Sequence, residues 1–111
     1  MAFEIVLAPG AIATLKDLSV PVRTDVVQAV QVHLTHEPTK VSKSRIKRLR
    51  GLSQPQYRLR VGDIRVFYDV TETQVQVLAI VTKAEAQAWL DQHGTPRPEG
   101  AAGGGAGGSE G

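Results

Sequence analysis

Apolar residues recur in regular patterns along most of the chain, and the first half predicts a strand followed by two helices. Residues 3–7 are apolar at every second position, which predicts a short strand that ends before Pro9. From Pro9 to Leu18 the apolar residues have helical spacing, and Ser19 provides the start signal for a second helix that ends before Pro38. Two helices in succession predict an antiparallel hairpin lying on a sheet.

The second half predicts a β-meander. Its apolar residues alternate with polar ones, as is typical of antiparallel strands with one buried face. Gly62-Asp63 is a turn signal between two of the strands, and residues 51–55 are predicted to be a loop. The predicted strands are residues 45–49, 57–61, 64–70 and 74–81.

The last predicted element is a helix. Thr82 with Glu85 three residues later forms a capping box, and the helix ends before Gly94. Residues 94–111 contain no bulky apolar side chain, so we predict a disordered Gly/Ala-rich tail behind one folded domain of residues 1–93. The predicted fold class is α+β: an N-terminal strand, a two-helix hairpin, an antiparallel meander and a C-terminal helix.

Positive charge is concentrated in one segment. The formal net charge is only +2, yet nine of the 13 Lys and Arg lie between Lys40 and Arg65, where Asp63 is the only acid. Clustered cations are typical of nucleic-acid binding, because each cation that neutralises a phosphate releases counterions. An ordinary solvated basic face is the alternative interpretation.

Three arginines are predicted to share one sheet face. Strand alternation places Arg58 and Arg60 on the face opposite the core, and Arg65 falls on the same side of the next strand. A guanidinium binds phosphate oxygens through a planar, two-pronged contact, so the trio favours an anionic ligand. Alternatively, Arg65 pairs with a carboxylate and the other two arginines face solvent. The nearby acids are Asp63, Asp69 and Glu72.

One stretch resembles a known family. Leu49-Arg-Gly-Leu followed by Tyr57-Arg-Leu-Arg-Val-Gly-Asp-Ile-Arg-Val-Phe-Tyr-Asp-Val70 is similar to the strand-turn-strand signature of RelE-like toxins in the RelE/ParE superfamily. The resemblance covers nearly all of residues 2–90 and implies a RelE-like fold. Such proteins are toxins of type II toxin–antitoxin modules: RelE members cut mRNA in the ribosomal A site, and ParE members inhibit DNA gyrase. The resemblance therefore implies a cognate antitoxin as partner, with no cofactor and no metal.

The resemblance also implies roles for individual residues. Arg58 and Arg60 match the family's basic pair, Arg65 matches the arginine that touches the scissile phosphate, and Lys83 is retained from a basic motif. These four form the predicted catalytic set, since cations stabilise the charge that develops when a ribose 2′-hydroxyl attacks phosphorus. The further cations expected to bind RNA are Lys43, Arg45, Lys47, Arg48 and Arg50.

At two positions the chain departs from the RelE pattern. Ala84 stands where the family has an arginine, and Leu90 stands where it has a residue used in proton transfer. Two hypotheses follow. In the first, the chain is a ribosome-dependent mRNA endonuclease, which binds RNA and thereby inhibits translation. In the second, it is a non-catalytic protein, either a ParE-like inhibitor of DNA gyrase or a RelE-like binding domain without enzymatic activity.

Composition adds an expectation about location. No apolar run approaches the roughly 20 residues of a membrane-spanning helix, and the N-terminal residues lack the features of a secretion signal. The sequence contains no Cys, which fits a reducing compartment. We expect a cytoplasmic protein without membrane association.

Overall fold

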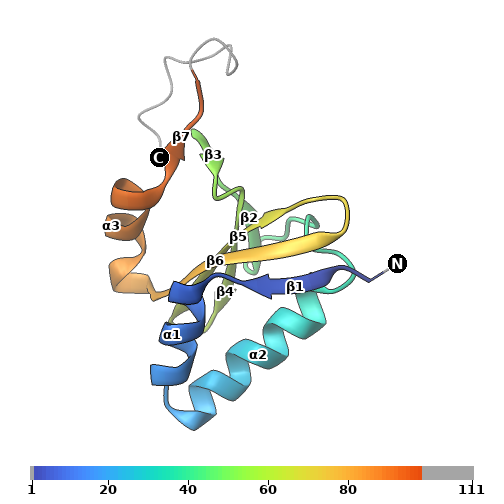
Figure 1. Ribbon diagram of the computed structural model, residues 1–111, viewed down its shortest axis with the longest axis vertical. Coiled ribbons are helices and arrows are strands. Elements are labelled where there is room, and N and C mark those ends of the chain that lie inside the picture. The colour runs from blue at the N-terminus through green and yellow to red at the C-terminus, as the bar shows by residue number, and fades with distance from the viewer. Residues whose placement is uncertain (1, 99–111) are drawn as a thin grey trace.

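The computed structural model describes residues 2–98 and shows a five-stranded sheet with helices on both faces (Figure 1). The strand order is β1-β6-β5-β4-β2, with β1 parallel to β6 and all other neighbours antiparallel. This α+β arrangement confirms the predicted fold class. The elements are β1 (Glu4–Leu7), α1 (Pro9–Asp17), α2 (Val20–Leu34), β2 (Ile46–Arg48), β3 (Leu52–Gln54), β4 (Tyr57–Val61), β5 (Ile64–Val70), β6 (Gln74–Thr82), α3 (Lys83–His93) and β7 (Thr95–Pro96).

The main core lies between the sheet and the α1–α2 hairpin, which sits below the sheet in Figure 1. One stripe of α2 faces the sheet because its apolar residues recur every four positions, as a helix of 3.6 residues per turn requires. Tyr68 is completely buried there, and its hydroxyl donates a hydrogen bond of 2.6 Å to the carbonyl oxygen of Pro38. The buried set comprises Ala11, Val26, Val30, Leu34, Ile46, Leu59, Ile64, Val66, Tyr68, Val75, Val77 and Ile80.

A register shift in β6 keeps both ends of this long strand in contact with the core. Phe67 pairs with Ala79 and Tyr68 pairs with Val77, so Leu78 is one extra residue on the β6 side. An extra residue reverses the alternation beyond it. Val77 and Ile80 therefore both face the α1–α2 hairpin although they are three positions apart.

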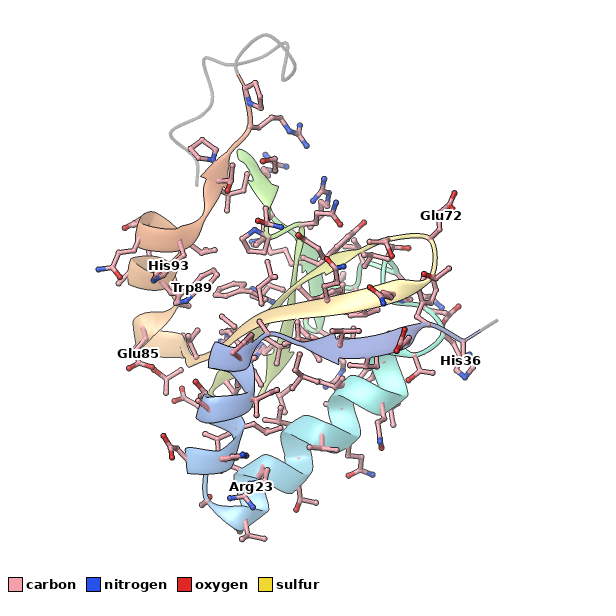
Figure 2. All side chains as sticks on the ribbon, in the orientation of Figure 1. Arg23, His36, Glu72, Glu85, Trp89 and His93 are labelled. Carbon is pink, nitrogen blue, oxygen red and sulfur yellow. The ribbon has the colours of Figure 1, made fainter. Side chains whose placement is uncertain are left out.

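The helix α3 covers part of the opposite sheet face. It starts at the predicted capping box: the Thr82 hydroxyl accepts from the Glu85 amide at 3.3 Å, and the Glu85 carboxylate accepts from the Thr82 amide at 3.2 Å. Trp89 stacks on Phe67 of β5 with ring centroids 5.4 Å apart. Figure 2 shows Trp89 directed from α3 toward the sheet, with His93 beside it.

Two short strands form a second, two-stranded sheet that the sequence patterns did not predict. Residues 51–55, expected to be a loop, contain β3, which pairs with β7 beyond the end of α3. Part of the expected tail is thus in a strand, while residues 99–111 lie outside the described residues. The boundary of the folded domain at residue 93 stays a prediction. Within residues 2–98 no helix has both the length and the apolarity needed to cross a membrane.

Candidate cationic cleft

A cleft of about 320 Å³ lies between the outer face of β4 and β5 and the helix α3, and we call it the cationic cleft. Four cations from four different elements converge on it, while the remaining wall is mostly apolar. No Asp or Glu is among the lining residues of the described chain, so its positive charge is not neutralised locally. The cleft is lined by Lys47, Leu49, Leu52, Arg58, Arg65, Phe67, Lys83, Ala86, Gln87 and Leu90.

Arg65 is the most buried of the four cations, with only 8% of its surface exposed. Its Nη1 donates to the carbonyl oxygens of Gly62 at 2.9 Å and Ile64 at 3.1 Å. The alternative that a carboxylate holds this arginine is wrong within residues 2–98, where the salt bridge between Lys40 and Glu37 is the only one. Carbonyl oxygens orient a guanidinium but leave its full charge uncompensated.

Arg58 lies opposite Phe67 in the β4–β5 pairing and faces the same cleft as Arg65. Its Nε is buried and has no hydrogen-bond partner in the described chain. Burial lowers the pKa of the Arg58 guanidinium from its ordinary value, and the charges of Arg65 and Arg60 lower it further. An anion beside such an arginine favours its charged form, because attraction to the anion opposes the repulsion from the neighbouring arginines.

The other predicted catalytic residues lie around these two. Arg60 is directly opposite Arg65 in the register, which confirms that the three arginines share one sheet face. Arg60 is exposed and does not line the cleft, whereas Lys83 does so from the first residue of α3. The Lys83 amide donates to the Asp63 carbonyl oxygen at 2.8 Å, which fixes the start of α3 beside the β4–β5 turn.

The five cations predicted to bind RNA do not form one group. Lys47 pairs with Arg58 across β2 and β4 and lines the cationic cleft. Arg48 instead lies with its guanidinium 5.1 Å from the centroid of the Tyr57 ring and donates to the Gln56 carbonyl oxygen at 2.8 Å. Arg45 lines two hollows beside α2, away from the cleft, and Lys43 and Arg50 are exposed without lining it.

The apolar wall of the cleft was not predicted. Phe67 has the same strand parity as Arg65, and an aromatic residue between cations on one face is a signal that something covers that face. Leu52 reaches the cleft because β3 passes beside it, and Ala86 and Leu90 reach it from α3. Leu90 therefore occupies the wall at the position where the resemblance leads one to expect a proton-transfer residue.

The buried acid of the cleft strands, Asp69 on β5, has a structural role. Asp69 is 7% exposed and accepts from the Gln54 side chain at 2.6 Å and from the Gln56 amide at 2.8 Å, so it fixes the connection between β3 and β4. Among residues 2–98, no three His, Cys, Asp or Glu side chains are grouped so that they could hold a metal ion. The chemistry that the described cleft offers is the binding of anions through guanidinium and ammonium groups.

Comparison with known proteins identifies the fold. No protein-family model matches the chain, and no curated protein matches it significantly. Solved structures do match: a chain of the archaeal RelE–RelB complex from Pyrococcus horikoshii has a TM-score of 0.62 at 22% identity, over 75% of this chain and 97% of that one. A RelE mutant from Escherichia coli in the free state gives 0.61 at 20% identity, over 80% and 92%.

A third match extends the same result. A chain of the toxin–antitoxin complex RelBE2 from Mycobacterium tuberculosis has a TM-score of 0.58 at 23% identity, over 74% of this chain and 99% of that one. These similarities cover nearly the whole length of each solved chain. The chain thus has a RelE-like fold, as the resemblance implied.

Proposed function

We propose that this chain is the toxin of a type II toxin–antitoxin module and that its cationic cleft binds the phosphodiester backbone of mRNA on the ribosome. The observation that carries the proposal is the cleft itself: Arg58, Arg65, Lys47 and Lys83 converge without an acid among the lining residues. Such a site opposes folding unless an anion occupies it, which favours a binding role over a structural one. The RelE-like fold supports the same class.

The proposed reaction is metal-free cleavage of RNA. The ribose 2′-oxygen loses its proton and forms a bond to the adjacent phosphorus while the bond to the 5′-oxygen breaks and that oxygen gains a proton. Arg65 and Arg58 stabilise the extra negative charge on the non-bridging oxygens. The lining residues of the described cleft include no His, Tyr, Asp or Glu, so in this proposal the ribosome or solvent supplies the proton transfers.

A second candidate function has one specific observation in its favour. Leu90 lines the cleft where the resemblance implies a proton-transfer residue, which leaves the site with binding groups alone. A protein of this kind would act by occupying a target without cleaving it, as a ParE-like inhibitor of DNA gyrase or as a catalytically inactive RelE-like domain. Both candidates retain an antitoxin as partner, and we place the protein in the cytoplasm in both.

One experiment separates the two candidates. The chain is expressed under a controlled promoter, and the 5′ ends of cellular mRNA are mapped together with plasmid supercoiling. We expect cuts inside reading frames, and we expect Arg65→Ala to reduce them by roughly two orders of magnitude, since a contact made mainly in the transition state is worth about 3 kcal/mol. Intact mRNA together with altered plasmid supercoiling would instead support inhibition of DNA gyrase.

Two further measurements complete that design. Lys16→Gln removes one exposed positive charge from α1 and should leave the cutting unchanged, so it controls for net charge. The thermal stability of Arg65→Ala has to be measured on the same sample, because this side chain also donates two hydrogen bonds to backbone carbonyls. A well-folded Arg65→Ala protein with full cutting activity would remove Arg65 from the mechanism.

The partner antitoxin is proposed to cover the cationic cleft with an acidic or amphipathic segment that folds on binding. Opposite charges steer encounter most strongly where cations gather without acids, and on the described chain this is the sheet face that carries Arg58, Arg60 and Arg65. The rate of association with the cognate antitoxin should fall steeply as the salt concentration increases. A rate insensitive to ionic strength would place the antitoxin elsewhere.

A further inference from the structure

A second hollow, of about 380 Å³, lies between the end of α2 and the residues that lead into β2, and we call it the α2–β2 pocket. Its lining combines a guanidinium, two imidazoles and two hydroxyls, which together can donate several hydrogen bonds to one anion. One of its lining residues, His36, lies on the opposite side of the molecule from Trp89 and His93 of α3 (Figure 2). The pocket is lined by Val32, His33, His36, Glu37, Lys40, Ser42, Ser44, Arg45 and Ile46.

The loop that carries Arg45 is held in shape by Ser42. The Ser42 amide donates to the Ile46 carbonyl oxygen at 2.9 Å, and the Ser42 Oγ accepts from the amides of Arg45 at 3.0 Å and Ile46 at 3.2 Å. A hydroxyl has two acceptor positions and one hydrogen to donate. Both acceptor positions of Ser42 are used inside the loop, so its hydrogen remains available to an acceptor such as a phosphate oxygen.

The charges of the pocket leave it positive. Arg45 forms no salt bridge within residues 2–98. The pKa of His33 is lowered mainly by burial and, second, by the charge of Arg45. Glu37 is the only acid of the lining, and its carboxylate lies 3.7 Å from the ammonium of Lys40. This pair is nearly neutral together, so the net field at the pocket comes from Arg45.

Strand register connects the pocket with the cationic cleft. The Arg60 amide donates to the Arg45 carbonyl oxygen at 2.9 Å, and Arg60 is paired with Arg65 on the next strand. Arg45 directly precedes β2, so the backbones of Arg45, Arg60 and Arg65 follow one another at strand spacing, roughly 10 Å from first to last. Arg45 lines the pocket beside α2 and Arg65 lines the cleft beside α3, so a ligand that contacts both has to pass around the edge strand β2. A single phosphate group cannot contact both ends of such a row, whereas a chain with repeated negative charges can.

We propose that the α2–β2 pocket binds a second phosphate of the same RNA strand whose scissile phosphate lies in the cationic cleft, with Arg45 and the Ser42 hydroxyl as its ligands and Arg60 along the path between the two sites. This inference rests on the proposed function, because it takes RNA as the ligand of the cleft. It assigns to Arg45 a role different from that of Arg65: Arg45 adds affinity for longer RNA and does not take part in cleavage.

The test compares RNA lengths on the intact chain. A fluorescent nonanucleotide and a trinucleotide, both with 2′-deoxy substitution to prevent cleavage, are titrated against the wild type, Arg45→Gln, Ser42→Ala, Arg65→Ala and the charge control Lys16→Gln. Arg45→Gln should weaken nonanucleotide binding about tenfold and lower the slope of log affinity against log salt by about 0.7, the value for one phosphate contact on a single strand. Trinucleotide binding should not change, and Lys16→Gln should match the wild type in both assays.

Each remaining outcome has a defined meaning. Nonanucleotide binding that Arg65→Ala abolishes and Arg45→Gln leaves intact would overturn the second site and preserve the proposed function. Failure of both RNAs to bind wild-type protein would overturn RNA binding by the cationic cleft itself, the premise on which this inference rests, and the mapping of mRNA ends tests the ribosome-dependent function separately. Binding of an oligoglutamate peptide that depends on Arg45, without any such dependence for RNA, would make the pocket a protein-docking site and overturn the proposal.

A second readout is independent of affinity. The imidazole of His33 is followed by NMR as the pH is varied, with and without the nonanucleotide. A phosphate bound beside Arg45 offsets its charge, so the pKa of His33 should rise when RNA is present. An unchanged His33 titration while the RNA is bound would show that no phosphate enters this pocket.

Discussion

The strands β4 and β5 have two faces of opposite character. Toward α1 and α2 they present apolar side chains such as Leu59 and Val66, which are fully buried. Toward α3 they present Arg58, Arg65 and Phe67, and the helix covers this face only in part. We infer that burial on the hairpin side stabilises the fold enough for the other side to hold charges that disfavour folding.

The largest effect on stability is expected on the hairpin side. Leu59→Ala removes a completely buried side chain from the centre of the core and should lower the free energy of unfolding by about 3 kcal/mol, from lost burial and the cavity left behind. Chemical denaturation measures it. Val32→Ala on the exposed side of α2 is the matched control and should change stability by less than about 0.5 kcal/mol. Equal losses of stability for Leu59→Ala and Val32→Ala would contradict a core confined to the space between the sheet and the α1–α2 hairpin.

Replacing a charged residue of the cationic cleft by a neutral one should raise the free energy of unfolding instead of lowering it. Arg58→Gln should weaken RNA binding about tenfold, as expected for the loss of one charge-assisted contact. It should also raise the free energy of unfolding by a few tenths to about 1 kcal/mol, because it removes repulsion from Arg65 and Arg60, which solvent partly screens. A destabilised Arg58→Gln protein would mean that Arg58 supports the fold.

Tyr68 tests the core through a hydrogen bond and through pH. Tyr68→Phe leaves the Pro38 carbonyl without this donor and should cost about 1 kcal/mol. Burial raises the pKa of Tyr68 far above its ordinary value of 10.0, so the folded chain keeps the hydroxyl neutral at a pH where the unfolded chain ionises it. This contribution is fully present below about pH 10 and is lost as the pH rises further. Unfolding at pH 8 and pH 11 should therefore show a larger alkaline loss for the wild type than for Tyr68→Phe.

The smallest effect concerns His33. Burial and the charge of Arg45 lower its pKa below the ordinary 6.5, so the unfolded state binds the proton more readily than the folded state. The contribution of His33 to stability is therefore present above about pH 6.5 and is lost as the pH falls through the lowered pKa. Melting at pH 7.5 and pH 5.5 should show a drop that is smaller in His33→Gln by a few tenths of a kcal/mol, since the group is largely solvent-screened. Identical drops would mean that the pKa of His33 is not lowered in the folded chain.

The long helices and strands could be predicted because their apolar residues recur with a helical or a strand period over several turns or several residue pairs. The capping box of α3 and the turn at Gly62, whose φ is +56°, are local signals that hold in the structure. The strands β3 and β7 have three and two residues, too few to show a period. They are stabilised by distant partners, such as the Asp69 carboxylate that accepts from Gln54, and a local pattern cannot reveal those.

For the site, alternation was sufficient to place Arg58, Arg60 and Arg65 on one face, since it depends only on strand parity. It could not show that α3 returns over that face, so the burial of Arg65 and the stack of Trp89 on Phe67 were not foreseen. The sequence also did not show which cations of residues 40–65 line the cationic cleft and which lie elsewhere. Whether Arg48 stacks on Tyr57 or joins the cleft depends on which neighbour each guanidinium meets in three dimensions.

The parallel pairing of β1 with β6 has a consequence for the order of events during synthesis. Glu4 pairs with Gln74, so β1 has no partner strand until β6 has emerged from the ribosome. The helices α1 and α2 are translated earlier, but the apolar stripe of α2 remains uncovered until the strands that bury it emerge. Both walls of the cationic cleft come together only when α3 follows β6 out of the tunnel. The cationic cleft is therefore incomplete in the nascent chain until α3 has emerged.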